Sequence, residues 1–285
     1  PGSTLHVSAD GTRALVTTYG SGRNTQTPGH TKGQFAAQVW NTQDGTAITA
    51  PIPHENMILA AAISPDGETI ATYVAGRGSA RLWRADTGQK IATCAQIGTD
   101  LAGALPQIAF SPNSRLCAIG TATGTVRLYA TSDGSLLGAT NHSDAITSIA
   151  FSPDNERLLT GSRDKTARLW LLVPVHSSGS TQNSDQNNRD TLFAIRESGI
   201  LHGHTKEVRQ VVFDATGQLA ATATDRINIY DVGTQRSSND PIHRYEVGRT
   251  IDRIQFAKDS RRILGLAGKR SLVWNFDTAR GVVTL

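Results

Sequence analysis

The sequence predicts an all-β fold, a β-propeller of about six four-stranded blades, on three observations. One apolar phrase with a polar turn at its centre recurs along the chain, as in AISPDGETIAT at 62–72 and AFSPDNERLLTGS at 150–162. A short strand follows each copy and ends on an aromatic residue: Trp40, Trp83, Tyr129, Trp170, Tyr230 or Trp274. These aromatics are 43, 46, 41, 60 and 44 residues apart, and four of the five spacings are close to the period of a propeller blade.

The copy at 146–170 shows why these residues favour strands and turns. Residues 146–151 form an apolar inner strand, and Ser-Pro-Asp-Asn at 152–155 follows as a turn, because proline fixes φ and the Asp and Asn side chains bond back to the backbone. Further strands are expected at 158–161 and 166–170, with a tight turn at 163–165 between them. Short strands of this kind occur in sandwiches, barrels and propellers, and the fixed period selects the propeller.

A single domain over 1–285 is expected to hold six blades. Their approximate bounds are 1–54, 55–98, 99–142, 143–203, 204–246 and 247–285. The fourth is lengthened by a polar insertion at 174–191, whose centre at 177–190 is too polar to fold alone and has no assigned role. No strand from one chain end completes a blade at the other, so an incomplete seven-bladed ring, or an excerpt from a larger multidomain protein, is the alternative.

Composition excludes several classes of protein. No stretch of 18 apolar residues occurs, and the chain has no pattern of a secretory signal, so no membrane contact is expected. Two cysteines in 285 residues are not a disulfide framework and fit a reducing compartment, so we expect a cytoplasmic (intracellular) protein. The formal net charge of +4 is too mild to indicate nucleic acid by itself.

The segment HSDAITSIAFSPDNERLLTGSRDKTARLW at 142–170 resembles the WD40-repeat family over a whole repeat. The name-giving acid after the aromatic is mostly absent, and only Tyr230-Asp231 keeps it. The resemblance implies that a His before the inner strand bonds to an Asp in the turn between the second and third strands, with a Ser or Thr and the aromatic completing a structural network. Such a network makes a blade rigid because its buried polar groups all have partners.

Three histidines occur at one repeat position and identify the candidate networks. Blade four has the full set: His142, Asp164, Trp170, and Thr160 or Ser162. Blade five has a variant set: His204, Asp225, Tyr230, and Thr222 or Thr224. Blade two has His54 and Trp83, but Arg77 and Gly78 stand at the turn, so its network is expected to be broken. Blades four and five are therefore expected to be the most rigid.

Cationic residues recur in the turns between second and third strands and in the loops that enter inner strands. The family geometry places both sets of loops on one face, around the channel mouth. These cations are the candidate partner-binding residues: Arg23, Lys32, Arg77, Arg163, Lys165, Lys206, Arg226, Lys269 and Arg270. A ring of them would favour an acidic protein or peptide. Exposed turns are also commonly charged without any partner, and this reading stays open.

The function expected is a protein–protein interaction scaffold or ligand-sensing module that binds a peptide or protein at its loop-rich narrow face. A sensor domain of a signalling NTPase-type protein is one alternative. The alternative of another class is a propeller hydrolase, for which Glu55, Asp100, Asp144 and Glu207 are the only candidate channel acids. No nucleophile elbow, CxxC, HExxH or phosphate-binding loop occurs, so we expect no enzyme, no metal and no cofactor. Nucleic acid is disfavoured because the charged turns lack aromatics for base stacking.

Overall fold

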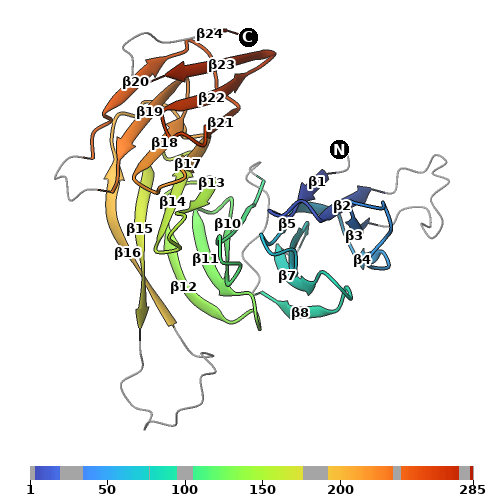
Figure 1. Ribbon diagram of the computed structural model, residues 1–285. Coiled ribbons are helices and arrows are strands. Elements are labelled where there is room, and N and C mark those ends of the chain that lie inside the picture. The colour runs from blue at the N-terminus through green and yellow to red at the C-terminus, as the bar shows by residue number, and fades with distance from the viewer. Residues whose placement is uncertain are drawn as a thin grey trace. The chain divides into compact units, whose positions relative to one another are not determined.

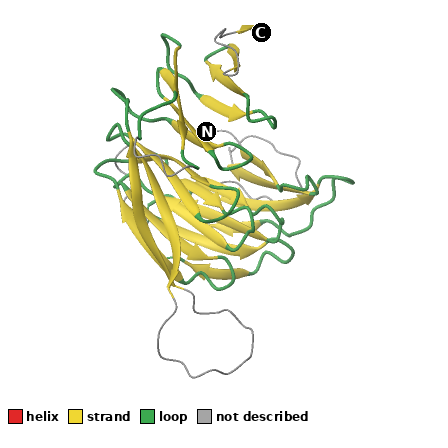
Figure 2. Cartoon of the chain, turned by 60° about the vertical axis from the view of Figure 1, so that its left-hand side comes forward, coloured by secondary structure: helices red, strands yellow, loops and turns green. Residues whose placement is uncertain are grey.

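The structure is a computed structural model that describes residues 4–19, 35–76, 78–94, 105–175, 192–233, 239–275 and 283–284. Every regular element in these ranges is a β-strand, as Figure 2 shows, and none of them contains a helix that could span a membrane. The strands form six four-stranded sheets, which we call blades one to six in chain order (Figure 1). The predicted all-β fold of six four-stranded units is therefore confirmed.

Each blade takes its four strands from one continuous stretch of chain, in the order in which they occur. Blades one to three contain β1 (Thr4–Val7), β2 (Arg13–Tyr19), β3 (Phe35–Asn41), β4 (Ile52–His54), β5 (Ile58–Ile63), β6 (Thr69–Val74), β7 (Ser79–Arg84), β8 (Lys90–Thr93), β9 (Gln107–Phe110), β10 (Leu116–Gly120), β11 (Thr125–Ala130) and β12 (Leu136–Asn141). Blades four to six contain β13 (Ile146–Phe151), β14 (Arg157–Ser162), β15 (Ala167–Val175), β16 (Leu192–Leu201), β17 (Gln210–Phe213), β18 (Leu219–Ala223), β19 (Arg226–Asp231), β20 (His243–Glu246), β21 (Arg253–Phe256), β22 (Arg262–Ala267), β23 (Arg270–Asn275) and β24 (Val283–Thr284).

The chain divides into two compact units, Pro1–Leu136 and Leu137–Leu285. The boundary falls at the first residue of β12, the outer strand of blade three. The sequence gives no sign of this boundary, because the repeat runs through it without a linker. The polar insertion at 177–190, whose role the sequence left open, lies outside the described residues.

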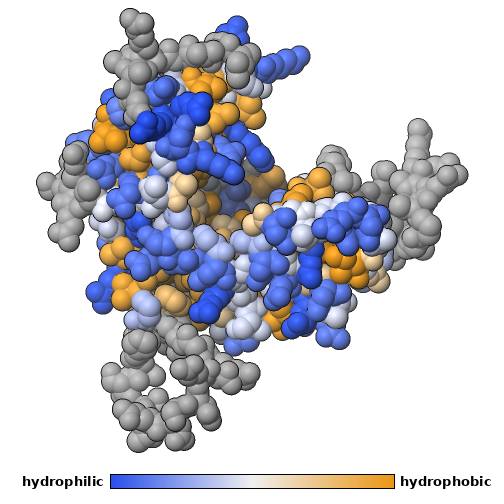
Figure 3. Space-filling model, viewed as in Figure 1, coloured by the Kyte–Doolittle hydropathy of each residue, from blue (hydrophilic) through white to orange (hydrophobic). Residues whose placement is uncertain are grey.

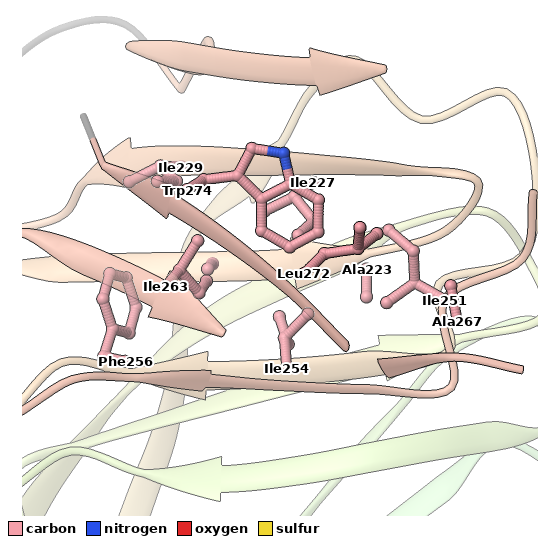
Figure 4. Close-up of a cluster of buried hydrophobic side chains, with 11 residues drawn as sticks. Ala223, Ile227, Ile229, Ile251, Ile254, Phe256, Ile263, Ala267, Leu272 and Trp274 are labelled. Carbon is pink, nitrogen blue, oxygen red and sulfur yellow. The ribbon is translucent and has the colours of Figure 1, made fainter. Parts of the chain in front are cut away.

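Apolar side chains of neighbouring blades pack together between the sheets of the second unit. Blades five and six share a cluster that includes Ile227, Ile229, Ile254, Ile263 and Trp274 (Figure 4). A second cluster joins blades four and five, and its buried residues come from strands that include β14, β17 and β19. Strand β18 is covered on both faces, so four of its five residues are buried. A strand enclosed in this way reads as continuously apolar or small, which explains the sequence LAATA.

The first unit is packed in the same way. Blades one and two share a cluster that includes Leu15, Val39, Ile70 and Trp83. Blades two and three share another, which encloses both free cysteines, Cys94 and Cys117. Burial raises the pKa of the Cys94 thiol to about 11, so both cysteines behave as small hydrophobic residues.

One turn conformation recurs between the first and second strands of all six blades. The fourth residue of the turn has a positive φ and donates its N–H to the carbonyl of the first; these residues are Gly11, Gly67, Ser114, Asn155, Gly217 and Ser260. In blade four a proline follows Ser152, and the Ser152 hydroxyl bonds to Asp154. The recurring phrase in the sequence is therefore the sequence of this turn and its two flanking strands.

Candidate functional site

His142 lies at the centre of a buried polar network in blade four. Its Nε2 is 2.7 Å from Oγ1 of Thr160, and its Nδ1 is 2.9 Å from Oδ2 of Asp164. The indole N–H of Trp170 donates to the same Thr160 oxygen at 2.8 Å. Asp164 also accepts from the N–H of Ser143 at 3.1 Å, so the network fixes the loop that precedes β13 to the β14–β15 turn.

The same arrangement recurs in two other blades at constant spacing. His54 Nε2 lies 3.0 Å from Thr72 Oγ1, and His204 Nε2 lies 2.8 Å from Thr222 Oγ1. In all three blades the threonine is 18 residues after the histidine and is fully buried. The structure thus places the three histidines at equivalent positions, each beside the aromatic of its blade.

Two expectations about these networks are wrong. The network of blade two is not broken: Trp83 donates to Thr72 at 2.9 Å, and His54 Nδ1 contacts the carbonyl of Ile52 at 2.9 Å in place of an acid. The turn residue that the sequence emphasised is therefore dispensable, because a backbone carbonyl replaces the carboxylate.

Asp225 does not belong to the network of blade five. Its carboxylate forms an ion pair with Lys206 at 2.8 Å, because that ammonium group reaches it from the preceding loop. The hydroxyl of Tyr230 completes the network of blade five, 3.2 Å from His204 Nε2, and it also donates to the carbonyl of His202 at 2.6 Å.

Electrostatics identify these histidines as neutral structural groups. Burial lowers the pKa of His54 and of His142, and it lowers the pKa of His204 to about 4. Burial opposes ionisation of Asp164, but hydrogen bonds from the side chain and N–H of Thr166 prevail and hold its pKa at about 2. Each histidine accordingly accepts or donates hydrogen bonds within its blade and presents no base to solvent.

The loops of the second unit form a continuous rim, made of the loops 142–145, 202–209 and 247–252 and the turns 163–166, 224–226 and 268–269. Two of the loops contact the preceding blade beside its turn: the N–H of Val208 donates to Ser162 at 3.0 Å, and that of Ile251 to Thr224 at 2.9 Å. The loop 142–145 contacts the turn of its own blade, because the N–H of Arg163 donates to Ala145 at 2.9 Å. The last turn joins through the N–H of Gly268, which donates to Asp252 at 2.9 Å. Backbone hydrogen bonds therefore hold this rim in place.

Ion pairs neutralise much of the predicted cationic ring. Arg163 lies 3.7 Å from Glu207, which also pairs with Arg209, and Lys206 pairs with Asp225. Arg226 pairs with Glu246, its partner across β19 and β20, at 2.9 Å. The cations can be found in the sequence, but the sequence does not show that acidic side chains of adjacent loops and strands lie close enough to pair with them.

The remaining predicted cations divide into two groups. Lys165, Lys269 and Arg270 are exposed, and none of them makes an ion pair with another described residue. Arg23, Lys32 and Arg77 lie outside the described residues, as does the candidate acid Asp100. The predicted cations without an ion partner therefore lie at or beside the turns of blades four and six.

The candidate acids of a hydrolase are engaged in structural contacts. Glu55 is hydrogen bonded by the guanidinium of Arg81, which lowers the pKa of that carboxyl to about 2. Glu207 pairs with two arginines, and Asp144 accepts from the N–H of Ala145 at 2.6 Å. Within the described ranges, no group of three or more His, Cys, Asp or Glu residues could hold a metal ion.

The sequence did not reveal a pair of arginines that join neighbouring blades. Arg13 donates from Nη1 to the carbonyl of Gly67 at 2.7 Å, and Arg157 donates from Nη2 to that of Gly217 at 2.8 Å. Both arginines occupy the same repeat position, and both carbonyls belong to the first turn of the next blade. Equal spacing within the repeat was the available signal, and it could have been found by aligning the six copies.

Comparisons with known proteins agree with this architecture. The family model described as "WD domain, G-beta repeat" matches residues 134–170 and 196–228, which include the whole network of blade four and, in blade five, His204 and Thr222. A chain in the solved structure titled "Crystal Structure of Mitotic Checkpoint Complex" is similar, with a TM-score of 0.68 at 15% identity over 99% of this chain and 78% of that chain. No curated protein matches the sequence. With six four-stranded blades and buried His–Thr–aromatic networks, the chain has a WD40-type β-propeller fold, in which residues 134–170 and 196–228 match the WD40 repeat.

Proposed function

We propose that this chain is a protein–protein interaction scaffold or ligand-sensing module, and that the rim of the second unit holds a protein or peptide partner. The observation that carries the proposal is the exposure of Lys165 and Lys269 on turns that hydrogen bonds of the backbone N–H groups hold in place. Charges fixed in position attract and orient an oppositely charged partner without a large entropic cost.

The partner proposed for the rim is acidic. Lys165 and Lys269 lie in the turns of two different blades, so an acidic segment that contacts both must be extended or part of a folded surface. Nucleic acid is disfavoured, because the described rim has no Phe, Tyr or Trp side chain for base stacking. The similar chain belongs to a structure of a multiprotein complex, which supports a protein partner here. We further propose that the protein acts inside the cell, because its cysteines are free.

Charge reversal on the rim tests this proposal. The test variant is Lys165→Glu with Lys269→Glu, and the matched control is Lys90→Glu with Lys258→Glu, two exposed lysines outside the rim. Each variant is expressed with an affinity tag, and the proteins that purify with it are quantified by mass spectrometry. We expect the amount of each partner protein recovered with the rim variant to be at least about tenfold lower than with the control. This difference corresponds to about 1.4 kcal/mol of binding free energy. Equal recovery with both variants would contradict a partner-binding rim.

A further inference from the structure

One repeat position carries side chains of very different length in the six blades. It is the fifth residue after the first residue of the turn between the first and second strands. In every blade its carbonyl accepts the N–H of that first turn residue. In chain order the residues at this position are Arg13, Thr69, Leu116, Arg157, Leu219 and Arg262. Thr69 has the shortest side chain of the six, and a pocket lies beside it.

The pocket lies between blades two and three and has a volume of about 310 Å³. All ten residues that line it belong to the unit Pro1–Leu136, and nine of them are polar or charged. Figure 3 shows mainly hydrophilic surface in the region where Figure 1 labels β7 and β8, two of the strands that border the pocket. Ligand sites begin at about this size, and a lining of this kind favours a polar or charged occupant.

Contacts between blades two and three hold the walls of the pocket in place. The N–H of Asp66 donates to Oγ of Ser114 at 3.0 Å, which joins the first turns of the two blades. A second contact is made by Gly134, which has a φ of +73°: a Cβ atom there would lie only 2.2 Å from the Cβ of Ala92 in β8. The turn that carries Ser132 therefore packs directly on blade two, and the pocket is preformed.

The junction of blades four and five shows which groups surround an arginine at this repeat position. Arg157 donates from Nη2 to Oδ2 of Asp154 in its own blade at 2.8 Å. It also donates from Nη2 to the carbonyl of Gly217 at 2.8 Å and from Nη1 to the carbonyl of Val232 at 2.9 Å, both in the next blade. One carboxylate and two carbonyls thus hold this guanidinium.

The residues that line the pocket include the counterparts of all three acceptors. Asp66 corresponds to the aspartate of the other junction, since Oδ1 of each accepts a serine hydroxyl and the N–H of the second residue after it. Ser114 corresponds to the glycine, because each is the fourth residue of the first turn in the following blade. Thr131 corresponds to the valine, because the N–H of each donates to the residue that directly follows that turn. Blades two and three therefore have the acceptors for a guanidinium but lack the arginine.

The charges around the pocket agree with a cation held near two acids. Neither Asp66 nor Glu68 forms an ion pair with another residue of the described chain. Two arginines also line the pocket; Arg84 is paired with Asp86 at 3.4 Å, and Arg115 is exposed. An anion bound by these arginines is the alternative occupant, and it is disfavoured because the two carboxylates would repel it.

We propose that this pocket binds a guanidinium group, supplied by an arginine side chain of a protein or peptide partner or by a small molecule such as free arginine. The carboxylate of Asp66 and the carbonyls of Ser114 and Thr131 accept its N–H groups, and Glu68 adds a second negative charge. A planar guanidinium with several donors suits acceptors on two blades better than an ammonium group does. The site is separate from the rim, because it lies on other blades and binds a cation in place of an acidic partner.

Binding of capped amino acids tests the site, with dissociation constants measured by saturation-transfer NMR titration. The probes are the N-acetyl methylamides of arginine, citrulline, lysine and glutamate, of which citrulline keeps the shape of arginine without its charge. Thr69→Arg supplies the missing side chain from within the chain, and its control is Thr123→Arg in an exposed turn of blade three. Asp66→Asn removes a charge from the site, and its control is Asp44→Asn in an exposed turn of blade one.

We expect the arginine probe to bind, and the other three probes to bind at least about tenfold more weakly. Thr69→Arg and Asp66→Asn should each weaken binding of the arginine probe at least about tenfold relative to their controls. Equal binding of the arginine probe and either the citrulline or the lysine probe overturns the proposal, and so does preferential binding of the glutamate probe. Equal binding of the arginine probe by Thr69→Arg and Thr123→Arg also overturns it.

Two further measurements complete the test. Circular dichroism shows whether each variant is folded; if Thr69→Arg does not fold, equal binding by Asp66→Asn and Asp44→Asn overturns the proposal instead. Free arginine, compared with its capped form, distinguishes the two sources of the guanidinium. Tighter binding of free arginine supports a small molecule, whose carboxylate can pair with Arg115, whereas equal or weaker binding supports an arginine side chain of a partner.

Discussion

Arg157 of β14 donates a hydrogen bond to the carbonyl oxygen of Gly217, 2.8 Å away in the first turn of the next blade. A second bond from its Nη1 reaches the carbonyl of Val232 at 2.9 Å, and its guanidinium lies 5.6 Å from the centre of the Phe213 ring. One side chain of blade four therefore contacts three parts of blade five. Because the guanidinium is planar and has several donors, it can make these contacts together, which an ammonium group cannot.

Replacing Arg157 by lysine should lower the free energy of unfolding by about 2 kcal/mol, since bonds from a charged donor to buried carbonyls are lost. Urea denaturation, followed by tryptophan fluorescence, measures the change. Arg115 lies one repeat position earlier, at the end of the corresponding turn of blade three, and is exposed, so Arg115→Lys is the control and should stay within about 0.5 kcal/mol of the unsubstituted chain. Equal effects of the two substitutions would show that Arg157 does not join the blades.

Replacing Thr160 by valine should lower the free energy of unfolding by about 3 kcal/mol. The volume is nearly kept, but His142 and the indole N–H of Trp170 both lose their buried partner. Thr72→Val should have a similar effect, because Thr72 bonds to His54 and Trp83 in the same way. Thr87 is exposed, and Thr87→Val is the control in the same denaturation experiment. A small effect of Thr72→Val beside a large one of Thr160→Val would mean that the blade-two network depends on its missing acid after all.

These networks show which part of the architecture the sequence could predict. The repeat length and the turn residues reflect interactions within one repeat. The strand order and the equivalence of the three histidines could therefore be predicted from the sequence alone. The sequence reading of blade two failed because it relied on the acid of the turn, whereas the constant partner is the threonine 18 residues after the histidine.

Contacts between repeats were harder to predict. Arg163 and Glu207 are 44 positions apart, and nothing in their local sequence indicates that they lie 3.7 Å apart in space. Fewer of the predicted cations are therefore available to a partner than the sequence suggested. Those without an ion pair are the ones whose neighbouring loops have no acidic side chain within reach.

Acid should destabilise the folded chain over a pH range that is set by the lowered pKa values of its buried histidines. The folded-state pKa of His204, about 4, lies below the ordinary value of 6.5, so unfolding takes up a proton. The stability from this group is complete above pH 6.5 and is lost as the pH falls to about 4, with a total of up to about 3 kcal/mol. Burial also lowers the pKa of His54 and His142, so they act in the same direction.

Measurement of the urea midpoint at a series of pH values from neutral to pH 4 checks this window. His204→Gln should flatten the decline, whereas His202→Gln, whose side chain is 60% exposed, should leave it unchanged. Asp164 has a pKa of about 2, so its contribution falls below the window and does not obscure the comparison. A decline of equal slope in both variants would assign the acid sensitivity to groups other than His204.

Gly265 sits where blades two, four and five have the network threonine, and it explains how blade six dispenses with a network. A Cβ atom at this position would lie 2.6 Å from Cζ3 of Trp274, so only glycine leaves space for that ring. Trp274 packs in one cluster with Ile227 and Ile229 of blade five (Figure 4). Its indole N–H is buried without a hydrogen-bond partner among the described atoms.

Gly265→Ala should therefore destabilise the chain by about 2 kcal/mol or more, because a close-packed ring must shift to admit a methyl group. Leu264→Ala, on the exposed side of the same strand, is the control and should cost less than about 1 kcal/mol. Trp274→Leu removes the ring that the methyl group meets, so the double variant should lose less stability than the sum of the two single losses. Strict additivity in this double-mutant cycle would show that Gly265 is required for its backbone and not for the space it leaves to Trp274.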